Sequence, residues 1–373
     1  MRAERFAPGR CARLVVKIGS SLLVRPDGSP RREWLASLLD DMVERRAAGQ
    51  QLVIVSSGAI ALGARALGLP GGGRASLDDA QAAAAVGQIM LARLYEELLD
   101  ERGVRAAQML VTLDDLEGRR RYLNASATLD RLLSLGAVPV LNENDSVATA
   151  EIRFGDNDRL AARVAQAAGA GGLILLSDVD GLYTADPARE PDAAFVDTVE
   201  RVDDAVMALG ARTSASGLGR GGMASKLQAA RMAGLAGVDL AVVSGRDDHP
   251  LRRFEETGRG TVFPAMRDAP ARKVWLAGGI RTSGRVHVDQ GAAAALAQGR
   301  SLLAAGVTRV EGAFARGDLV EVADRSGAIA RGLVAYGAEE AARIAGKRNE
   351  EQAVLLGYAP RSALIHRDHL ALL

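Results

Sequence analysis

Through about its first 260 residues, the chain alternates short, continuously apolar runs with longer segments of helical periodicity. Helices are predicted over residues 32–49, 81–103 and 157–170, each closing at or beside a glycine. This alternation predicts an α/β fold, a three-layer αβα sandwich around a mainly parallel sheet. The five apolar runs, rich in Val, Ile and Leu, predict its buried strands: RLVVKIG (13–19), QLVIVSSG (51–58), AVPVLNEND (137–145), GLILLSDVDG (172–181) and VDLAVVSG (238–245).

A different pattern follows residues 260–273, where Pro264 and Pro270 interrupt a polar connector. Beyond this connector, over residues 284–346, short strands alternate with turns, and at most two short helices are expected. The pattern predicts a small β-rich barrel. We therefore predict a first domain over residues 1–262, a linker over residues 263–279 and a second domain over residues 280–373.

Composition narrows the function classes. A net charge of +1 gives no field of one sign, which argues against a nucleic acid or a membrane surface as partner. The single Cys11 excludes an internal disulfide and is typical of a reducing cytosol. The first residues lack an apolar signal core, and no window approaches 18 apolar residues. We therefore expect a cytoplasmic protein without a membrane segment.

Two polar clusters stand next to each other in the chain. Residues 142–145 (Asn-Glu-Asn-Asp) leave the strand predicted at 137–145, and residues 156–158 (Asp-Asn-Asp) open a helix. Ligands of parallel α/β sheets bind beyond the carboxyl ends of the strands. Amide and carboxylate groups gathered at one crevice are costly unless a polar ligand or a cation fills it. The alternative is that the first cluster is a turn and the second a helix cap, since Asn and Asp favour both.

Lysine is rare, because Arg fills almost every basic position. The 47 Lys plus Arg residues include four lysines, at positions 17, 226, 273 and 347. Lys17 ends the first strand, and Lys226 follows glycines at 217, 219, 221 and 222, in a helix predicted to begin near Met223. A Gly-rich loop before a helix can bind phosphate, although the Walker A spacing is absent and such a loop alone is weak support. A lysine is a compact point charge, which suits a phosphoryl group whose charge shifts between oxygens. Chance placement of these two lysines is the alternative.

The histidines all lie late in the chain, from His249 onward. An imidazole base is therefore not expected in the first 248 residues. Phosphoryl transfer to a carboxylate requires none, because that nucleophile is already ionised near neutral pH.

Five segments together resemble the amino acid kinase family: VVKIGSS, VIVSSGAIALG, VLNENDSVATAEIRFGDND, LLSDVDGLYTADP and GRGGMASKLQAA. The similarity runs from about residue 13 to the C-terminus, where the last hundred residues resemble a PUA module. NENDSVATAEI and GDND resemble the members that phosphorylate glutamate, whereas the lysine, the Gly-rich loops and GLYTADP are shared more widely.

The resemblance implies transfer of the ATP γ-phosphoryl group to the side-chain carboxylate of L-glutamate. The product would be L-glutamyl 5-phosphate, at the first step of proline biosynthesis, and proline would inhibit by feedback. ATP is then a substrate, and Mg²⁺ bridges its phosphates mainly through ATP oxygens and water, so no side chain is assigned as a metal ligand. A homo-oligomer and transfer of the product to glutamyl phosphate reductase are also implied.

The resemblance also assigns site residues, position by position. Lys17 and Lys226 would stabilise the transferring phosphoryl group, and Asp158 would hold the two ammonium groups. Ser177 stands where the family more often has Thr, Arg220 stands where Thr is expected, and Asp180 has no assigned role. The implied glutamate-binding residues are Ser57, Gly58, Ala59, Asp145, Asp156 and Asn157. The implied ATP-binding residues are Lys17, Ser177, Asp178, Arg220, Gly221, Gly222, Met223, Ala224, Ser225 and Lys226.

Other functions remain as alternatives. Aspartokinase, acetylglutamate kinase and uridylate kinase would share the lysines and glycines but not NENDSVATAEIRFGDND. An RNA-binding protein is a second alternative, since PUA modules usually contact RNA. Residues 274–373 hold twelve Lys plus Arg against ten Asp plus Glu, a net charge of +2. RNA readers tend to have a strongly basic face, so RNA binding is not expected.

Overall fold

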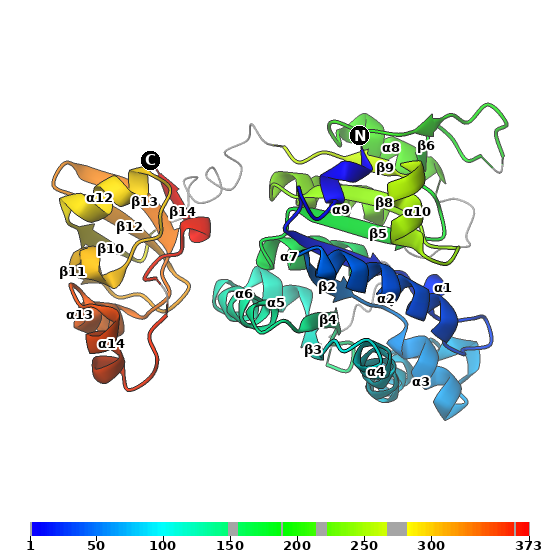
Figure 1. The fold of residues 1–373 in the computed structure, drawn as a ribbon, viewed down its shortest axis with the longest axis horizontal. Helices are drawn as coiled ribbons and strands as arrows, with labels where there is room; N and C mark the ends of the chain where they lie inside the picture. Colours follow the sequence, from blue (N-terminus) through cyan, green and yellow to red (C-terminus); the bar gives the residue numbers. More distant parts are fainter. Residues whose placement is uncertain are drawn as a thin grey trace. The chain divides into compact units, whose positions relative to one another are not determined.

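The computed structural model describes residues 2–147, 156–187, 189–213, 222–266, 282–361 and 363–372. The chain forms two compact units (Figure 1). The first consists of Met1–Glu117 and Ala125–Arg267, and the second consists of Gly118–Asn124 and Asp268–Leu373. Among the described residues, no helix is both long and apolar enough to cross a membrane.

The first unit is built on a seven-stranded sheet in the order β3-β4-β2-β1-β5-β8-β9. All neighbouring strands are parallel except β8 and β9. The mainly parallel α/β fold is therefore confirmed, and all five predicted strands are present. Strands β3 and β9 were not predicted. The bounds are β1 Arg13–Ile18, β2 Gln51–Val55, β3 Ala106–Val111, β4 Val138–Glu143, β5 Gly172–Ser177, β8 Asp239–Ser244 and β9 Thr261–Phe263, with a separate ribbon of β6 Leu182–Tyr183 and β7 Phe195–Val196.

Helices lie on both faces of this sheet. The even-numbered positions of β1, Leu14, Val16 and Ile18, belong to one core with residues of α2, α4 and α10. Because successive strand residues point to opposite faces, Lys17 points to the other side, where α7 contacts β1 and α9 packs on α7. The helices are α1 Ser20–Leu23, α2 Arg32–Ala47, α3 Ala59–Leu67, α4 Leu77–Asp100, α5 Leu113–Glu117, α6 Arg119–Ser134, α7 Asp156–Ala167, α8 Asp204–Thr213, α9 Met223–Leu235 and α10 Pro250–Thr257.

Glycines end three of the predicted helices, and a serine caps the start of one of them. Gly49, Gly103 and Gly169, after α2, α4 and α7, have φ of 90°, 67° and 60°, the left-handed conformation that closes a helix at low cost for glycine. Helix α4 begins earlier than predicted because Ser76 caps it. The Ser76 hydroxyl oxygen accepts a hydrogen bond from the Asp79 N–H at 3.1 Å.

The second unit contains a five-stranded sheet in the order β11-β10-β12-β13-β14, so the β-rich prediction is confirmed. At most two short helices were expected over residues 284–346, where Gln290–Ala297 and Ala338–Ile344 are helical, and a third helix, Asn349–Leu356, follows among the described residues. Two have a glutamate in the first turn whose carboxylate reaches back to the N-cap: Glu340 accepts from the Gly337 N–H at 3.3 Å, and Glu351 from the Arg348 N–H at 3.1 Å. The elements are β10 Gly284–Val288, α12 Gln290–Ala297, β11 Val307–Gly312, β12 Leu319–Asp324, β13 Gly327–Leu333, α13 Ala338–Ile344, α14 Asn349–Leu356 and β14 Leu370–Leu372.

Candidate active site

The carboxyl ends of four parallel strands bring most of the predicted site residues to one edge of the sheet. In β1, Lys17 lies opposite Val55 of β2 and Leu175 of β5. Ser57 follows Val55 by two residues, and Ser177 follows Leu175 by two residues. The register therefore places all three side chains at the same edge, where ligands of open parallel sheets bind.

A buried cluster of two lysines and one aspartate lies at this edge. The Lys17 Nζ is 2.6 Å from Asp158 Oδ1, and the Lys226 Nζ is 3.1 Å from Asp158 Oδ2. Each carboxylate oxygen thus contacts one ammonium group. The cluster joins the end of β1 to the first turns of α7 and α9, three segments that are far apart in the sequence. Sequence reasoning placed both lysines at one crevice, and the structure brings them together around Asp158.

Burial and charge act against each other in this cluster. Asp158 has no exposed surface, and Lys17 and Lys226 are 8% and 7% exposed. Burial lowers the pKa of Lys17, helped by Lys226, while Asp158 opposes that shift. Burial alone would raise the pKa of Asp158, but the two ammonium groups bring it below its ordinary value. Two ammonium groups and one carboxylate leave one net positive charge in a region with little water, which favours an anionic ligand.

Ser57 and Asn157, both predicted to bind substrate, are hydrogen-bonded to each other. The Asn157 Nδ2 donates to the Ser57 Oγ at 2.7 Å, and Asn157 Oδ1 is buried with no partner among the described residues. Gly58 is the N-cap of α3 and has φ of 100°, a conformation that favours glycine. The N–H groups of Gly58 and Ala59, at the start of this helix, have no carbonyl one turn earlier in the helix to bind. They can therefore receive a carboxylate next to the Asn157 and Ser57 pair.

Asp145 lies beyond the end of β4 and is 9% exposed. Burial raises the pKa of its carboxyl group to about 6. Asn144, the residue before Asp145, is held by β3, one of the strands that was not predicted. The Asn144 N–H donates a hydrogen bond to the Val111 carbonyl at the end of this strand. A buried carboxylate held in this way is suited to a cationic group such as an α-ammonium.

The predicted nucleotide residues occupy two neighbouring segments. Ser177 and Asp178 follow β5, and the Ser177 hydroxyl donates to Asp178 Oδ1 at 3.1 Å. Gly222 is the N-cap of α9, so the helix begins at Met223 as predicted. Ala224 and Ser225 follow in its first turn. Arg220 and Gly221 lie outside the described residues, as does the side chain of Asp156, whose backbone begins α7.

Asp180, which had no role assigned from the sequence, belongs to a structural cluster. Arg259 Nε donates to Asp180 Oδ2 at 2.9 Å, and the Tyr183 hydroxyl donates to Asp180 Oδ1 at 3.2 Å. The Arg259 guanidinium carbon also lies 3.6 Å from the centroid of the Phe195 ring. These contacts fix the β6–β7 ribbon against the connection between α10 and β9.

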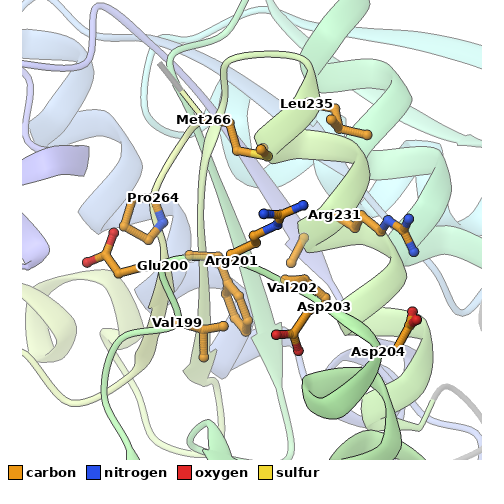
Figure 2. A pocket seen from close by; sticks show the side chains of 13 residues that line it. Val199, Glu200, Arg201, Val202, Asp203, Asp204, Arg231, Leu235, Pro264 and Met266 are labelled. Atoms are coloured by element: carbon orange, nitrogen blue, oxygen red, sulfur yellow. The ribbon is translucent and has the colours of Figure 1, made fainter. Parts of the chain in front are cut away.

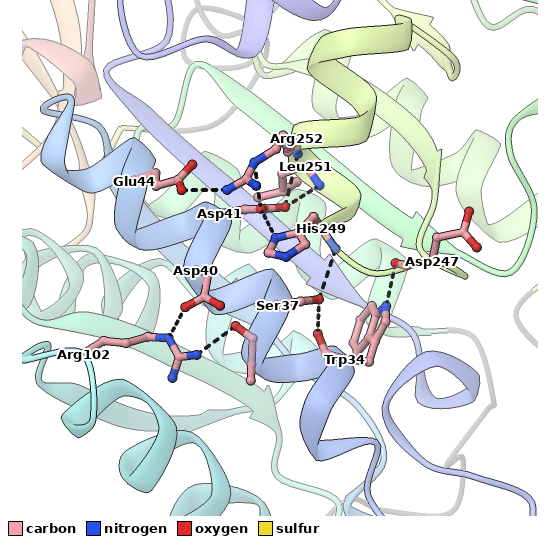
Figure 3. A network of polar contacts seen from close by, with 11 residues as sticks. Trp34, Ser37, Asp40, Asp41, Glu44, Arg102, Asp247, His249, Leu251 and Arg252 are labelled. Carbon is pink, nitrogen blue, oxygen red and sulfur yellow. Dashed lines mark hydrogen bonds and ion pairs between the residues drawn. The ribbon is translucent and has the colours of Figure 1, made fainter.

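His249 has a structural position on the opposite face of the sheet (Figure 3). It is the N-cap of α10, and its Nδ1 lies 2.8 Å from Asp41 Oδ1 of α2. Asp41 Oδ2 accepts hydrogen bonds from the N–H groups of Leu251 and Arg252, and Ser37 Oγ accepts one from the His249 N–H. The network binds α10 to α2 and lies away from the lysine cluster, which faces α7.

A hollow of about 270 Å³ lies between residues 199–204, α9 and the end of β9 (Figure 2). It is lined on the α9 side by Arg231, Gly234 and Leu235. Ala230, the lining residue of this helix nearest to Lys226, is four residues after it, which corresponds to roughly 6 Å along the helix axis. None of the predicted site residues lines this hollow, so it is separate from the candidate active site.

A mainly parallel α/β sheet with a buried, net-positive lysine cluster at the carboxyl ends of its strands defines a class: enzymes that bind and transfer phosphoryl groups. The family model "Amino acid kinase family" matches residues 12–244, and the model "PUA domain" matches residues 284–353.

Relatives of nearly the same length show which kind of amino acid kinase the chain resembles. The chain is 60% identical over 369 residues to the "Glutamate 5-kinase" of Sphingopyxis alaskensis, covering 99% of both chains. It is 58% identical over 369 residues to that of Zymomonas mobilis, covering 99% of this chain and 93% of the relative. It is 60% identical over 372 residues to that of Novosphingobium aromaticivorans, covering 100% and 98%. The chain therefore belongs to the amino acid kinase family and, within it, to the glutamate 5-kinases with a C-terminal PUA domain.

Proposed function

We propose that the protein transfers the γ-phosphoryl group of ATP to the side-chain carboxylate of L-glutamate, giving ADP and L-glutamyl 5-phosphate at the first step of proline biosynthesis. The observation that carries this proposal is the Lys17–Asp158–Lys226 cluster, at the same sheet edge as the Ser57–Asn157 pair. One sub-site suits a phosphoryl group, and the other suits the polar ends of an amino acid.

The two lysines supply the electrostatic part of catalysis. In phosphoryl transfer, negative charge spreads over the oxygens of the transferring group, so positioning and charge neutralisation provide most of the rate. Lys17 Nζ and Lys226 Nζ are held by different oxygens of one carboxylate, and their positions are set before substrate arrives. Such preorganised charges stabilise a transition state without reorganising during the reaction.

The attacking group needs no base. A glutamate side chain is ionised near neutral pH, and its oxygen attacks the γ-phosphorus directly. The bond from the γ-phosphorus to the bridging oxygen breaks, and ADP leaves. His249, bound to Asp41 on the other face of the sheet, takes no part in this transfer.

The glutamate would be held by its α-groups. Asp145 would pair with the α-ammonium, and Ser57, Asn157 and the N–H groups of Gly58 and Ala59 would bind carboxylate oxygens. On the nucleotide side, Ser177, Asp178 and the start of α9 would contact ATP. Mg²⁺ would enter with ATP. Both carboxylate oxygens of Asp158 contact lysines, and Asp178 is only partly buried at the same edge. These residues fit a metal that is held mainly by phosphate oxygens and water.

ADP release by the purified protein tests this proposal. With ATP and Mg²⁺, we expect release to be stimulated by L-glutamate and not by aspartate, acetylglutamate or UMP. If ADP release is unaffected by glutamate but is stimulated by aspartate or UMP, the chain uses another substrate.

Proline and glutamate are expected to share Asp145, because both carry an α-carboxylate and an α-nitrogen. Asp145→Asn should raise the KM for glutamate and the concentration of proline needed for inhibition together. In the unsubstituted protein, kcat/KM for glutamate should fall as the pH drops through about 6, where Asp145 takes up a proton and loses its attraction for an ammonium group. That inflection should be absent in Asp145→Asn.

Steady-state kinetics between pH 5 and 8 check both expectations, with Asp192→Asn, at an exposed position, as the matched control. If Asp145→Asn weakens glutamate but leaves proline inhibition unchanged, the two ligands bind separate sites.

The second domain is proposed to be separable from the chemistry. Every residue assigned to catalysis or binding precedes residue 227, so a chain ending at Arg267 should fold and phosphorylate glutamate. Assembly or the response to proline is expected to change instead, since the protein is proposed to be a cytoplasmic homo-oligomer. Turnover of the truncated chain measures this, and a folded but inactive product would place part of the active site in the second domain. The boundaries of 1–262, 263–279 and 280–373 remain predictions.

Two proposals concern partners. The product is an acyl phosphate, so glutamyl phosphate reductase is the expected consumer. RNA binding by the second domain is not expected, and tight, strongly salt-dependent binding of RNA would contradict this.

A further inference from the structure

Helix α4 contacts backbone or side chains beside three of the proposed glutamate-binding positions, although none of its residues has a role in the proposed chemistry. We infer that α4 positions the glutamate half of the site, through Gly87, Gln88 and Tyr95. The inference rests on the proposed function, because it concerns the residues assigned to glutamate.

The first contact is between the backbones of α3 and α4. A Cβ atom added to Gly87 would lie 1.7 Å from the Ala59 carbonyl oxygen and 2.9 Å from the Gly63 nitrogen. A Cβ atom added to Gly63 would lie 1.8 Å from the Ala83 carbonyl oxygen. Neither neighbour is a flexible side chain, so any larger residue must push the two helices apart. Ala59 is the first residue of α3, and its N–H is one of the proposed carboxylate donors.

The second contact fixes the end of β4. Gln88 is 7% exposed, and its Nε2 donates to the Glu143 carbonyl at 3.1 Å. Glu143 is the last residue of β4, two residues before Asp145. A buried amide that satisfies a strand-end carbonyl restrains the backbone from which the Asp145 side chain departs.

The third contact fixes the end of β2. The hydroxyl of Tyr95, a fully buried residue, lies 2.9 Å from the Ser56 Oγ. Ser56 immediately precedes Ser57. Gln88 and Tyr95 are seven residues apart, so they lie on one face of α4. One long helix, capped by Ser76, therefore restrains the segments that carry Ser57, Ala59 and Asp145.

The predicted nucleotide residues depend on other elements, namely the end of β5 and the start of α9. Substitutions in α4 should therefore affect the two substrates differently. A purely structural role for α4 would instead lower stability or kcat without separating glutamate from ATP.

The test compares Gly87→Ala with Gly234→Ala. Gly234 is also helical, but its added Cβ would be 3.8 Å from the nearest side-chain atom, Met266 Cγ, an ordinary contact. In Gly87→Ala we expect the KM for glutamate to rise on the order of 10- to 100-fold, as for a displacement of about 1 Å in a binding group, with the KM for ATP within about twofold of the original. Gly234→Ala should leave both constants unchanged.

Gln88→Met provides the second variant, in case Gly87→Ala does not fold. It keeps the side-chain length, removes the amide donor, and should raise the KM for glutamate several-fold while sparing that for ATP. Unchanged KM values for glutamate in folded variants, or equal increases for both substrates, would overturn the inference. If the unsubstituted protein does not use glutamate at all, the proposed function fails instead, which is a distinguishable result.

Discussion

Lys226→Ala is expected to lower kcat by at least about 100-fold, the scale of losing one preorganised electrostatic group. The Lys226 ammonium is buried and held 3.1 Å from Asp158 Oδ2, at the beginning of α9. In the proposed reaction it adds positive charge at the place where negative charge develops during transfer, and water cannot replace it at equal strength.

Lys226→Arg should not restore full turnover. A guanidinium is planar and larger, and the space around an ammonium that is 7% exposed is fitted to a compact charge. Lys347→Ala is the matched control, because Lys347 lies in the second unit, where its Nζ is 3.5 Å from Oε1 of the exposed Glu351. Steady-state turnover at saturating ATP and glutamate measures the effect. Near-original turnover in Lys226→Arg would show that the choice of lysine at this position is incidental.

Asp158→Asn is expected to reduce both stability and turnover severely. Removing the carboxylate charge leaves two buried ammonium groups facing each other, and breaking a buried ion pair in this way typically destabilises by about 3–5 kcal/mol. The asparagine keeps the side-chain size, so the loss reports charge and not packing. Without the bridging carboxylate, Lys17 and Lys226 also lose the group that fixes their positions, and kcat should fall with the stability.

The pH dependence of unfolding tests how much the Asp158 charge contributes to stability. The folded-state pKa of Asp158 is lower than its ordinary value of 3.8, so its contribution to stability is present above pH 3.8 and is lost as the pH falls through the lowered pKa. Urea unfolding at pH 7 should show the full difference between Asp158→Asn and the original protein, while Asp192→Asn at an exposed position should show almost none. Equal stability of Asp158→Asn at pH 7 would mean that the lysines are not held by this charge.

The strands predicted from sequence are those buried on both faces, where continuous apolar runs leave little ambiguity. Strand β3 was not predicted because its sequence, AAQMLV, includes the polar Gln108. The strand lies at the sheet edge and alternates in burial, so it lacks a continuous apolar run. Strand β9 is three residues long, too short for any periodicity.

The residues of the candidate site also differ in whether the sequence could predict their roles. Lys17 and Lys226 stood out because lysine is rare in this chain, and their common partner Asp158 came with the resemblance. The role of Asp180 could not be predicted, because its partner Arg259 is 79 residues away in the sequence. Gly87, Gln88 and Tyr95 carried no signal either. A glycine inside a helical pattern does not reveal that another backbone approaches it, and that information exists only once α3 and α4 are packed.

The central claim is that a glutamate side-chain carboxylate receives the phosphoryl group, and the chemical nature of the product tests it most directly. An acyl phosphate reacts with hydroxylamine to form a hydroxamate, whereas a phosphate ester or free phosphate does not. Incubation of the purified protein with ATP, Mg²⁺, L-glutamate and hydroxylamine should yield glutamyl hydroxamate in proportion to ADP, and Lys226→Ala should yield at least about 100-fold less. ADP formed at the full rate without any hydroxamate would contradict the account.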